Sequence, residues 1–221
     1  FVKWTRYMVP LLPLFIIASI WTWQRLKNRF RSSFIFYLLF FILLFEVTIR
    51  GVSFFTIYLQ PDTRIQAAQW VQENVAKKAS LLIEANEPNS IAFNASHKDT
   101  LIEFDFAELS SRDDAPEELN QKLDKADYFI LSSRRNYFHA LQHPHLYPKQ
   151  FLFYKSLFDN ELGFKEAARF ENKPCILSQN TQSRLPNILT YIICPINSDN
   201  AEGTFAVFDH PTVRVYEKLE F

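Results

Sequence analysis

The chain has 221 residues, and its 24 basic and 24 acidic side chains give a formal net charge of zero. It therefore has no global basic field of the kind that recruits nucleic acid, and we expect no nucleic-acid partner. Three glycines are too few for a phosphate-binding glycine loop, and two cysteines exclude a disulfide-rich fold and a four-cysteine zinc site. We expect neither a metal nor a cofactor.

Two apolar stretches open the chain, at residues 7–23 and 34–58. Because about 20 apolar residues in a helix cross a bilayer, residues 1–60 are predicted to form a transmembrane helical hairpin. A secretory signal is the alternative, but no small-residue cleavage site follows the first stretch. The connecting loop, 24–33, is basic and by the positive-inside rule cytoplasmic. Residues 61–221 are then extracytoplasmic, at a plasma or inner membrane.

The chain opens on Phe1, and its first apolar stretch begins almost at once. We expect it to be the C-terminal piece of a longer polypeptide whose upstream transmembrane helices are its partners. Glu46 and Arg50 lie one helical turn apart inside the second stretch, where they can pair. The favoured interpretation is a structural pair facing neighbouring helices, and the alternative is a polar cavity near the outer leaflet.

In residues 61–221, expected helices alternate with strands and are then followed by strands alone, which predicts an α/β domain with a mixed sheet. A helix is expected from Pro61 to Val75, with Ile65, Ala68, Trp70 and Val71 on its apolar face. Further helices are expected at Ser110–Lys125 and Phe151–Phe158, and strands at Leu81–Glu84, Leu101–Phe106, Tyr128–Leu131, Phe164–Phe170, Ile188–Cys194, Phe205–Phe208 and Val213–Tyr216. A turn at 209–212 is predicted to join the last two strands.

Two groups of residues invite a chemical interpretation that we do not favour. His139 and His143 have helical spacing, but zinc needs more ligands and Pro144 would break the helix. Asp209 and His210 resemble part of a hydrolase triad, but adjacent residues on a tight turn rarely face each other, and a hairpin turn is favoured.

Cys175 and Cys194 allow two arrangements. A disulfide outside the cell is one, and two buried strand thiols are the arrangement that we favour.

The opening segment, Lys3–Pro13, resembles the K-x-x-R-Y-x-x-P-x-x-P stretch before a late transmembrane helix in membrane glycosyltransferases of the GT-C class. The soluble part resembles the C-terminal domain of proteins in this class related to the dolichyl-phosphate-mannose protein mannosyltransferases and aminoarabinose transferases. The matching stretches, in the expected order, are Pro61–Val75, Ala126–Arg135, Leu146–Phe164 and Thr204–Lys218.

This resemblance implies a glycosyltransferase of the hexosyltransferase type. It would move a sugar from a polyprenyl-phosphate carrier in the bilayer to a protein, lipid or glycan acceptor at the outer membrane face. In this class the catalytic carboxylate lies in the first extracytoplasmic loop, which this chain lacks, so no residue here is assigned as catalytic. The competing hypothesis is a non-catalytic, membrane-anchored ectodomain that binds a ligand or a partner protein.

Two sets of residues are candidates for binding. Lys3 and Arg6, helped by the hydroxyl of Tyr7, would lie at the outer end of the first helix and hold the carrier phosphate, with ordinary contact to lipid headgroups as the alternative. The other set follows the strand at 128–131, and the ends of such strands in α/β sheets often hold ligand-binding groups. These residues would contact an acceptor or a sugar. The alternative is a surface loop with solvated arginines. This second set comprises Ser132, Ser133, Arg134, Arg135 and Tyr137.

Overall fold

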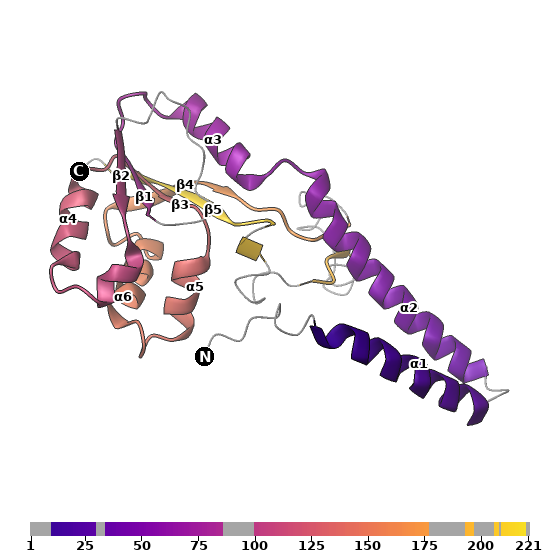
Figure 1. Cartoon of the computed structure of the whole chain (residues 1–221). Helices are drawn as coiled ribbons and strands as arrows, with labels where there is room; N and C mark the ends of the chain where they lie inside the picture. Colours follow the sequence, from indigo (N-terminus) through magenta and orange to yellow (C-terminus); the bar gives the residue numbers. More distant parts are fainter. Residues whose placement is uncertain are drawn as a thin grey trace. The chain divides into compact units, whose positions relative to one another are not determined.

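The computed structural model describes residues 10–29, 34–85, 100–176, 193–196, 206–207 and 209–219. The chain divides into two compact units, which are treated separately below (Figure 1). The helical unit comprises Phe1–Thr56 and Pro174–Asn197, and the α/β unit comprises Ile57–Lys173 and Ser198–Phe221.

The helical unit contains helices α1 (Leu12–Arg29) and α2 (Phe34–Phe55). They touch through Trp23 and Phe40, whose ring centroids are 4.6 Å apart. Among the described residues, one helical stretch, Tyr37–Asn74, is long and apolar enough to cross a membrane, and its apolar part is α2. The apolar side chains of α2 are largely exposed, as in a helix whose natural surroundings are lipid.

Helix α1 differs from the expected first span. It continues through Arg25 and Lys27 to Arg29, so the first part of the predicted loop at 24–33 is helical. Its described apolar part ends at Trp23 and spans about 18 Å, short of the roughly 30 Å of a hydrocarbon core. A hairpin that crosses the membrane twice therefore stays a prediction.

The sequence allowed a bond within each of two pairs of residues in the helical unit. Glu46 and Arg50 form the expected ion pair on α2, and Arg50 Nη1 also donates to the carbonyl of Pro195 at 3.2 Å. Cys175 and Cys194 form a disulfide, so the favoured arrangement of two buried strand thiols is wrong. Neither cysteine lies in a strand, and a backbone hydrogen bond between their neighbours helps to hold the two segments together.

The α/β unit is built on a five-stranded mixed sheet, which confirms the expected fold class. Its strands are β1 (Leu81–Glu84), β2 (Leu101–Phe104), β3 (Tyr128–Leu131), β4 (Phe164–Phe170) and β5 (Val213–Lys218). Their spatial order is β2-β1-β3-β5-β4. The first three run parallel, whereas β5 is antiparallel to both β3 and β4.

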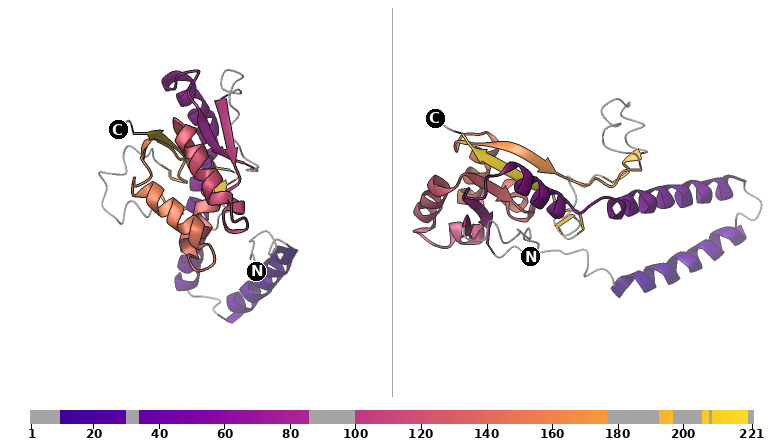
Figure 2. Two further views of the ribbon diagram at one scale, coloured as in Figure 1. Left: turned by 90° about the vertical axis from the view of Figure 1, so that its left-hand side faces the viewer. Right: turned by 90° about the horizontal axis from the view of Figure 1, so that it is seen from above.

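Helices cover both faces of this sheet (Figures 1 and 2). Helix α3 (Thr63–Asn74) packs on one face, and α4 (Ala115–Lys125), α5 (Arg135–Gln142) and α6 (Pro148–Phe158) pack on the other. Both faces need apolar side chains because both are covered, which explains why β1 and β3 are almost continuously apolar.

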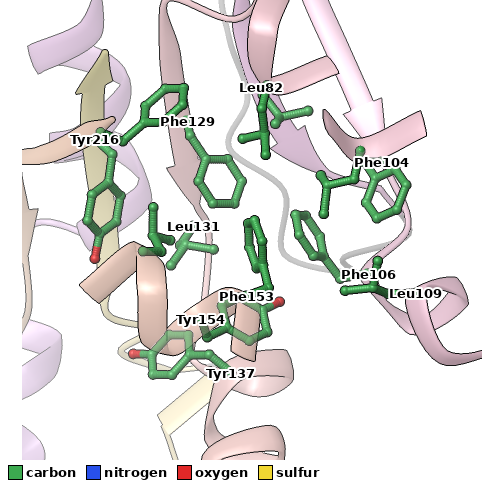
Figure 3. Close-up of a cluster of buried hydrophobic side chains, with 14 of the residues drawn as sticks. Leu82, Phe104, Phe106, Leu109, Phe129, Leu131, Tyr137, Phe153, Tyr154 and Tyr216 are labelled. Carbon is green, nitrogen blue, oxygen red and sulfur yellow. The ribbon is translucent and has the colours of Figure 1, made fainter. Parts of the chain in front are cut away.

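Successive side chains of a strand point to opposite faces, so each strand supplies two cores. On the α3 face, Leu81, Ile83 and Ile130 pack against Ala67 and Val71. The other face holds an aromatic cluster, shown in Figure 3, in which the side chains of η4 (a 3₁₀ helix, Phe106–Ser110), α5 and α6 meet those of the sheet. Its labelled members are Leu82, Phe104, Phe106, Leu109, Phe129, Leu131, Tyr137, Phe153, Tyr154 and Tyr216.

Three local predictions need correction. The buried side of α3 is formed by Thr63, Ala67 and Val71, and the predicted Ala68 and Trp70 pack against the same core; of the predicted apolar face only Ile65, which is 56% exposed, is misplaced. Helix α5 was not predicted, although its apolar residues Tyr137, Phe138, Ala140 and Leu141 have helical spacing. Ala206 and Val207 are helical, so the strand predicted at Phe205–Phe208 and its hairpin with β5 are wrong.

The strand predicted at Ile188–Cys194 lies largely outside the described residues. Its last two residues are described, and neither belongs to a strand.

Candidate functional site

The sheet brings several strand ends to one edge. The parallel strands β1, β2 and β3 all end there, β5 begins there opposite β3, and β4 ends there opposite β5. From β1 the chain passes to β2 on one side and then crosses to β3 on the other, so the ends of β1 and β3 flank a topological switch point. Ligands of open α/β sheets bind at such a point.

A pocket with a volume of about 240 Å³ lies at this edge, and we call it the basic pocket. Its lining residues come from the segment after β3, from α5, and from the end of β4 and the start of β5. They are Arg134, Tyr137, Phe138, Arg169, Glu171, Lys173, Thr212 and Arg214. All of them belong to the α/β unit.

Positive charge dominates the basic pocket, where four cationic side chains face the single carboxylate of Glu171. Lys173 pairs with this carboxylate at 3.5 Å. Glu166, beside the lining, accepts hydrogen bonds from Arg169 at 2.8 and 3.0 Å and a long one from Arg214 at 3.4 Å. The lining keeps an excess of three positive charges, or two when Glu166 is counted.

Arg134 connects β3 to the pocket. It stands at the N-cap position of α5, and only 5% of it is exposed. Its guanidinium lies over the ring of Phe138 at 4.8 Å, a cation–π contact that fixes the group against the pocket wall.

The neighbours of Arg134 have other roles. Ser132 and Ser133 are buried, and the Ser133 hydroxyl accepts a hydrogen bond from the backbone N–H of Arg135 at 3.2 Å, which supports the start of α5. Arg135 does not line the basic pocket. Of the five residues predicted here, Arg134 and Tyr137 reach the pocket, and the two serines shape the loop.

Tyr137 and Arg214 form the inner wall. The Arg214 guanidinium lies over the rings of Phe158 and Tyr137, at 4.9 and 5.5 Å. Burial raises the pKa of Tyr137 although the nearby Arg214 and Arg134 oppose the shift, so its hydroxyl stays protonated. Burial likewise raises the pKa of Tyr216, beside Arg214 on β5, to about 12.

Sequence reasoning missed a buried carboxylate, Glu84, at the end of β1. It is 2% exposed and accepts hydrogen bonds from the Tyr154 hydroxyl at 3.1 Å and from Asn136 Nδ2 at 3.3 Å. Tyr154 in turn packs edge-on against Tyr137 at 6.0 Å, so Glu84 lies in the layer behind the pocket wall. The sequence signal for Glu84 was an acidic residue at the end of an otherwise apolar strand.

His210 lies beside the basic pocket, at a hollow of about 10 Å³ that has room for one water molecule. Burial lowers the pKa of His210, Arg134 lowers it further, and Asp209 opposes them. The Asp209 carboxylate accepts a hydrogen bond from the Tyr58 hydroxyl at 2.9 Å.

The remaining site predictions have separate outcomes. Lys3, Arg6 and Tyr7 lie outside the described residues. Within the described ranges, no three histidine, cysteine or acidic side chains gather as a metal site would require, and His143 touches His145 only ring to ring, at 6.1 Å between centroids.

The arrangement is suited to holding an anion. Arginine keeps its proton at all physiological pH values and offers paired N–H donors to an oxyanion, so it binds and orients but does not act as a base. The chain matches no protein-family model, no characterised protein and no solved structure. The resemblance to membrane glycosyltransferases therefore rests on the residues that carry it.

Proposed function

We propose that this chain is the C-terminal part of an integral-membrane glycosyltransferase that moves a sugar from a polyprenyl-phosphate carrier to an acceptor at the outer membrane face. The observation that carries the proposal is the exposed apolar helix α2, which continues into the short 3₁₀ helix Thr56–Leu59 and is followed, after residues 60–62, by α3 of the α/β unit. Such a chain can keep a soluble domain beside a substrate embedded in lipid. The ordered set of sequence stretches supports the same activity.

The disulfide supports the proposed side of the membrane. Structural disulfides persist in oxidising compartments and are rare in the cytosol. The bond between Cys175 and Cys194 therefore favours an extracytoplasmic position for this part of the chain.

The residues have separate roles in the proposed reaction. Lys3 and Arg6, with Tyr7, hold the carrier phosphate and stabilise the negative charge that grows on it as the sugar departs. The catalytic carboxylate belongs to an upstream loop. In the α/β unit, Arg134 and Tyr137 are the residues placed to contact an acceptor, and Ser132, Ser133 and Arg135 shape the segment that carries them.

The test is a transfer assay in membrane vesicles that contain the full-length protein and a labelled polyprenyl-phosphate sugar. The double variant Lys3→Ala/Arg6→Ala should lose most transfer while keeping the disulfide and protease resistance of the wild type. Lys27→Ala, which removes a cation from the C-terminal end of α1, is the matched control and should transfer normally. Equal transfer by the double variant and the control would count against the phosphate-holding role.

A second candidate is a non-catalytic, membrane-anchored ectodomain that binds a ligand. The composition of the basic pocket favours it, because cations and a protonated tyrosine hydroxyl bind ligands without supplying a base. Full-length protein that transfers no sugar from any polyprenyl-phosphate donor, but still binds a ligand in the pocket, would select this candidate.

A further inference from the structure

We propose that the basic pocket is a binding site for a small anionic sugar, that is, a single sugar ring that bears a phosphoryl or carboxylate group. The site lies wholly within the α/β unit. The proposal does not depend on the glycosyltransferase activity, because it concerns what the pocket holds and not what the chain transfers.

The first argument is the positive charge at a partly enclosed place. Arg134 is 5% exposed and the side chain of Arg214 is 19% exposed, so both have given up much of their hydration. Like charges brought together in this way are unfavourable unless carboxylates or a bound anion offset them. Glu166 and Glu171 offset only part of the charge of the four cations.

The second argument is that Arg214 uses its hydrogen-bond donors only weakly. Its Nε–H is buried and makes no hydrogen bond to any of the described residues. Its Nη1 has only long contacts, 3.4 Å to Glu166 and 3.5 Å to the Tyr216 hydroxyl. A guanidinium with weakly used donors can turn its planar fork to an oxyanion and make two parallel hydrogen bonds.

The third argument is the shape and lining of the pocket. Its volume of about 240 Å³ is below the range of roughly 300–1,000 Å³ typical of sites for larger ligands, so it suits one sugar ring with its charged group. Tyr137 and Phe138 supply aromatic surface, and Tyr137 and Thr212 supply hydroxyl groups that can bond to sugar hydroxyls.

The direct test is calorimetric titration of the purified full chain in detergent with four probes: glucose 6-phosphate, glucuronate, glucose and inorganic phosphate. We expect at least one anionic sugar to bind, with affinity that falls as salt is raised, and glucose not to bind. Binding of the phosphorylated sugar alone identifies a phosphoryl ligand, and binding of glucuronate alone identifies a carboxylate ligand. Binding of both supports the shared oxyanion chemistry.

Variants locate the binding. Arg214→Gln should weaken binding of the anionic sugar at least tenfold, because a charge-assisted pair of hydrogen bonds is lost. Arg169→Gln removes a more exposed lining cation, with less risk to folding, and should also weaken binding, by about threefold. Arg112→Gln is the control, since Arg112 is engaged in surface ion pairs and does not line the pocket.

Three results would overturn the proposal. One is the absence of binding by both anionic sugars. Another is equal binding of inorganic phosphate and sugar phosphate, which would remove the role of the sugar ring. The third is unchanged affinity in Arg169→Gln together with a folded, fully binding Arg214→Gln variant.

Discussion

The aromatic cluster beneath the sheet should respond strongly to the loss of its central ring, Phe106. This side chain is 1% exposed, and its ring centroid lies 5.0 to 5.7 Å from those of Phe104, Phe129, Phe153 and Tyr154. Replacing a buried phenylalanine by alanine costs about 3–5 kcal/mol through lost burial and the cavity left behind. Because four aromatic neighbours also lose their contacts, we expect about 4 kcal/mol for Phe106→Ala.

Pulse proteolysis of the full chain in mild detergent and increasing urea measures this change. With a urea dependence of about 2 kcal/mol per molar, the midpoint should fall by roughly 2 M. Phe106→Leu should lose only about 1.5 kcal/mol, which keeps the experiment readable if the alanine variant does not fold. Leu152→Ala removes a 63% exposed side chain and should change the free energy of unfolding by less than about 0.5 kcal/mol. A shift below 1 kcal/mol in Phe106→Ala would refute the central position of this ring.

The disulfide, a buried histidine and a buried threonine give the remaining predictions. A thiol reagent should label neither Cys175 nor Cys194 before reduction and both after it, as read by mass; labelling of the unreduced chain would contradict the bond. Because burial lowers the pKa of His210, the unfolded chain takes up the extra proton in acid. The free energy of unfolding should therefore stay constant above about pH 6.5 and fall as the pH drops below that value. The fall should be smaller in His210→Asn, and an equal pH dependence in the wild type and this variant would argue against His210 as the cause. Thr63→Val should cost about 1 kcal/mol, since Thr63 Oγ1 donates to the Pro211 carbonyl at 2.7 Å, and an unchanged urea midpoint would rule that contact out.

Three strands of the α/β unit were predicted well, and two of them, β1 and β3, are short runs dominated by apolar residues. The boundaries of β1, β3 and β4 agree with the sequence prediction at both ends. In α3 the start was also correct, since the Asp62 carboxylate accepts a hydrogen bond from the Arg64 N–H as an N-cap should. These are local signals, which depend on neighbours in the sequence.

One helix was missed although its sequence carries a signal. The apolar residues of α5 have helical spacing, but the helix has only eight residues, fewer than periodicity needs to be diagnostic, and Tyr137 and Ala140 pack into the core with α6 and the sheet. In α3 only Ile65 of the predicted apolar face was misplaced. Trp70 and Val71 do pack on the core at the sheet, but Ile65 is 56% exposed, because the side of a helix that is buried depends on its partner.

Two of the eight residues that line the candidate site were predicted from the sequence. Arg134 and Tyr137 could be named because they follow a strand whose end is a common binding position. Arg169 and Arg214 could not, because they come from strands that reach this edge only through antiparallel pairing far along the chain. No sequence pattern indicates that β5 adds to β3, so of the four cations that line the pocket the sequence predicted only Arg134.

An irregularity in β4 explains why even a correct prediction of the β4–β5 pairing would have left the predicted pocket incomplete. In a regular strand, side chains alternate, so Glu166 and Arg169, three positions apart, would point to opposite faces. The register is interrupted between Glu166 and Ala168, and Arg169 then pairs with Arg214 while Glu166 pairs with Tyr216. The extra residue puts both on the face that carries the basic pocket, where Arg169 binds Glu166 and stands beside Arg214. The contribution of Arg169 to the positive charge at this edge thus depends on a single register shift in β4.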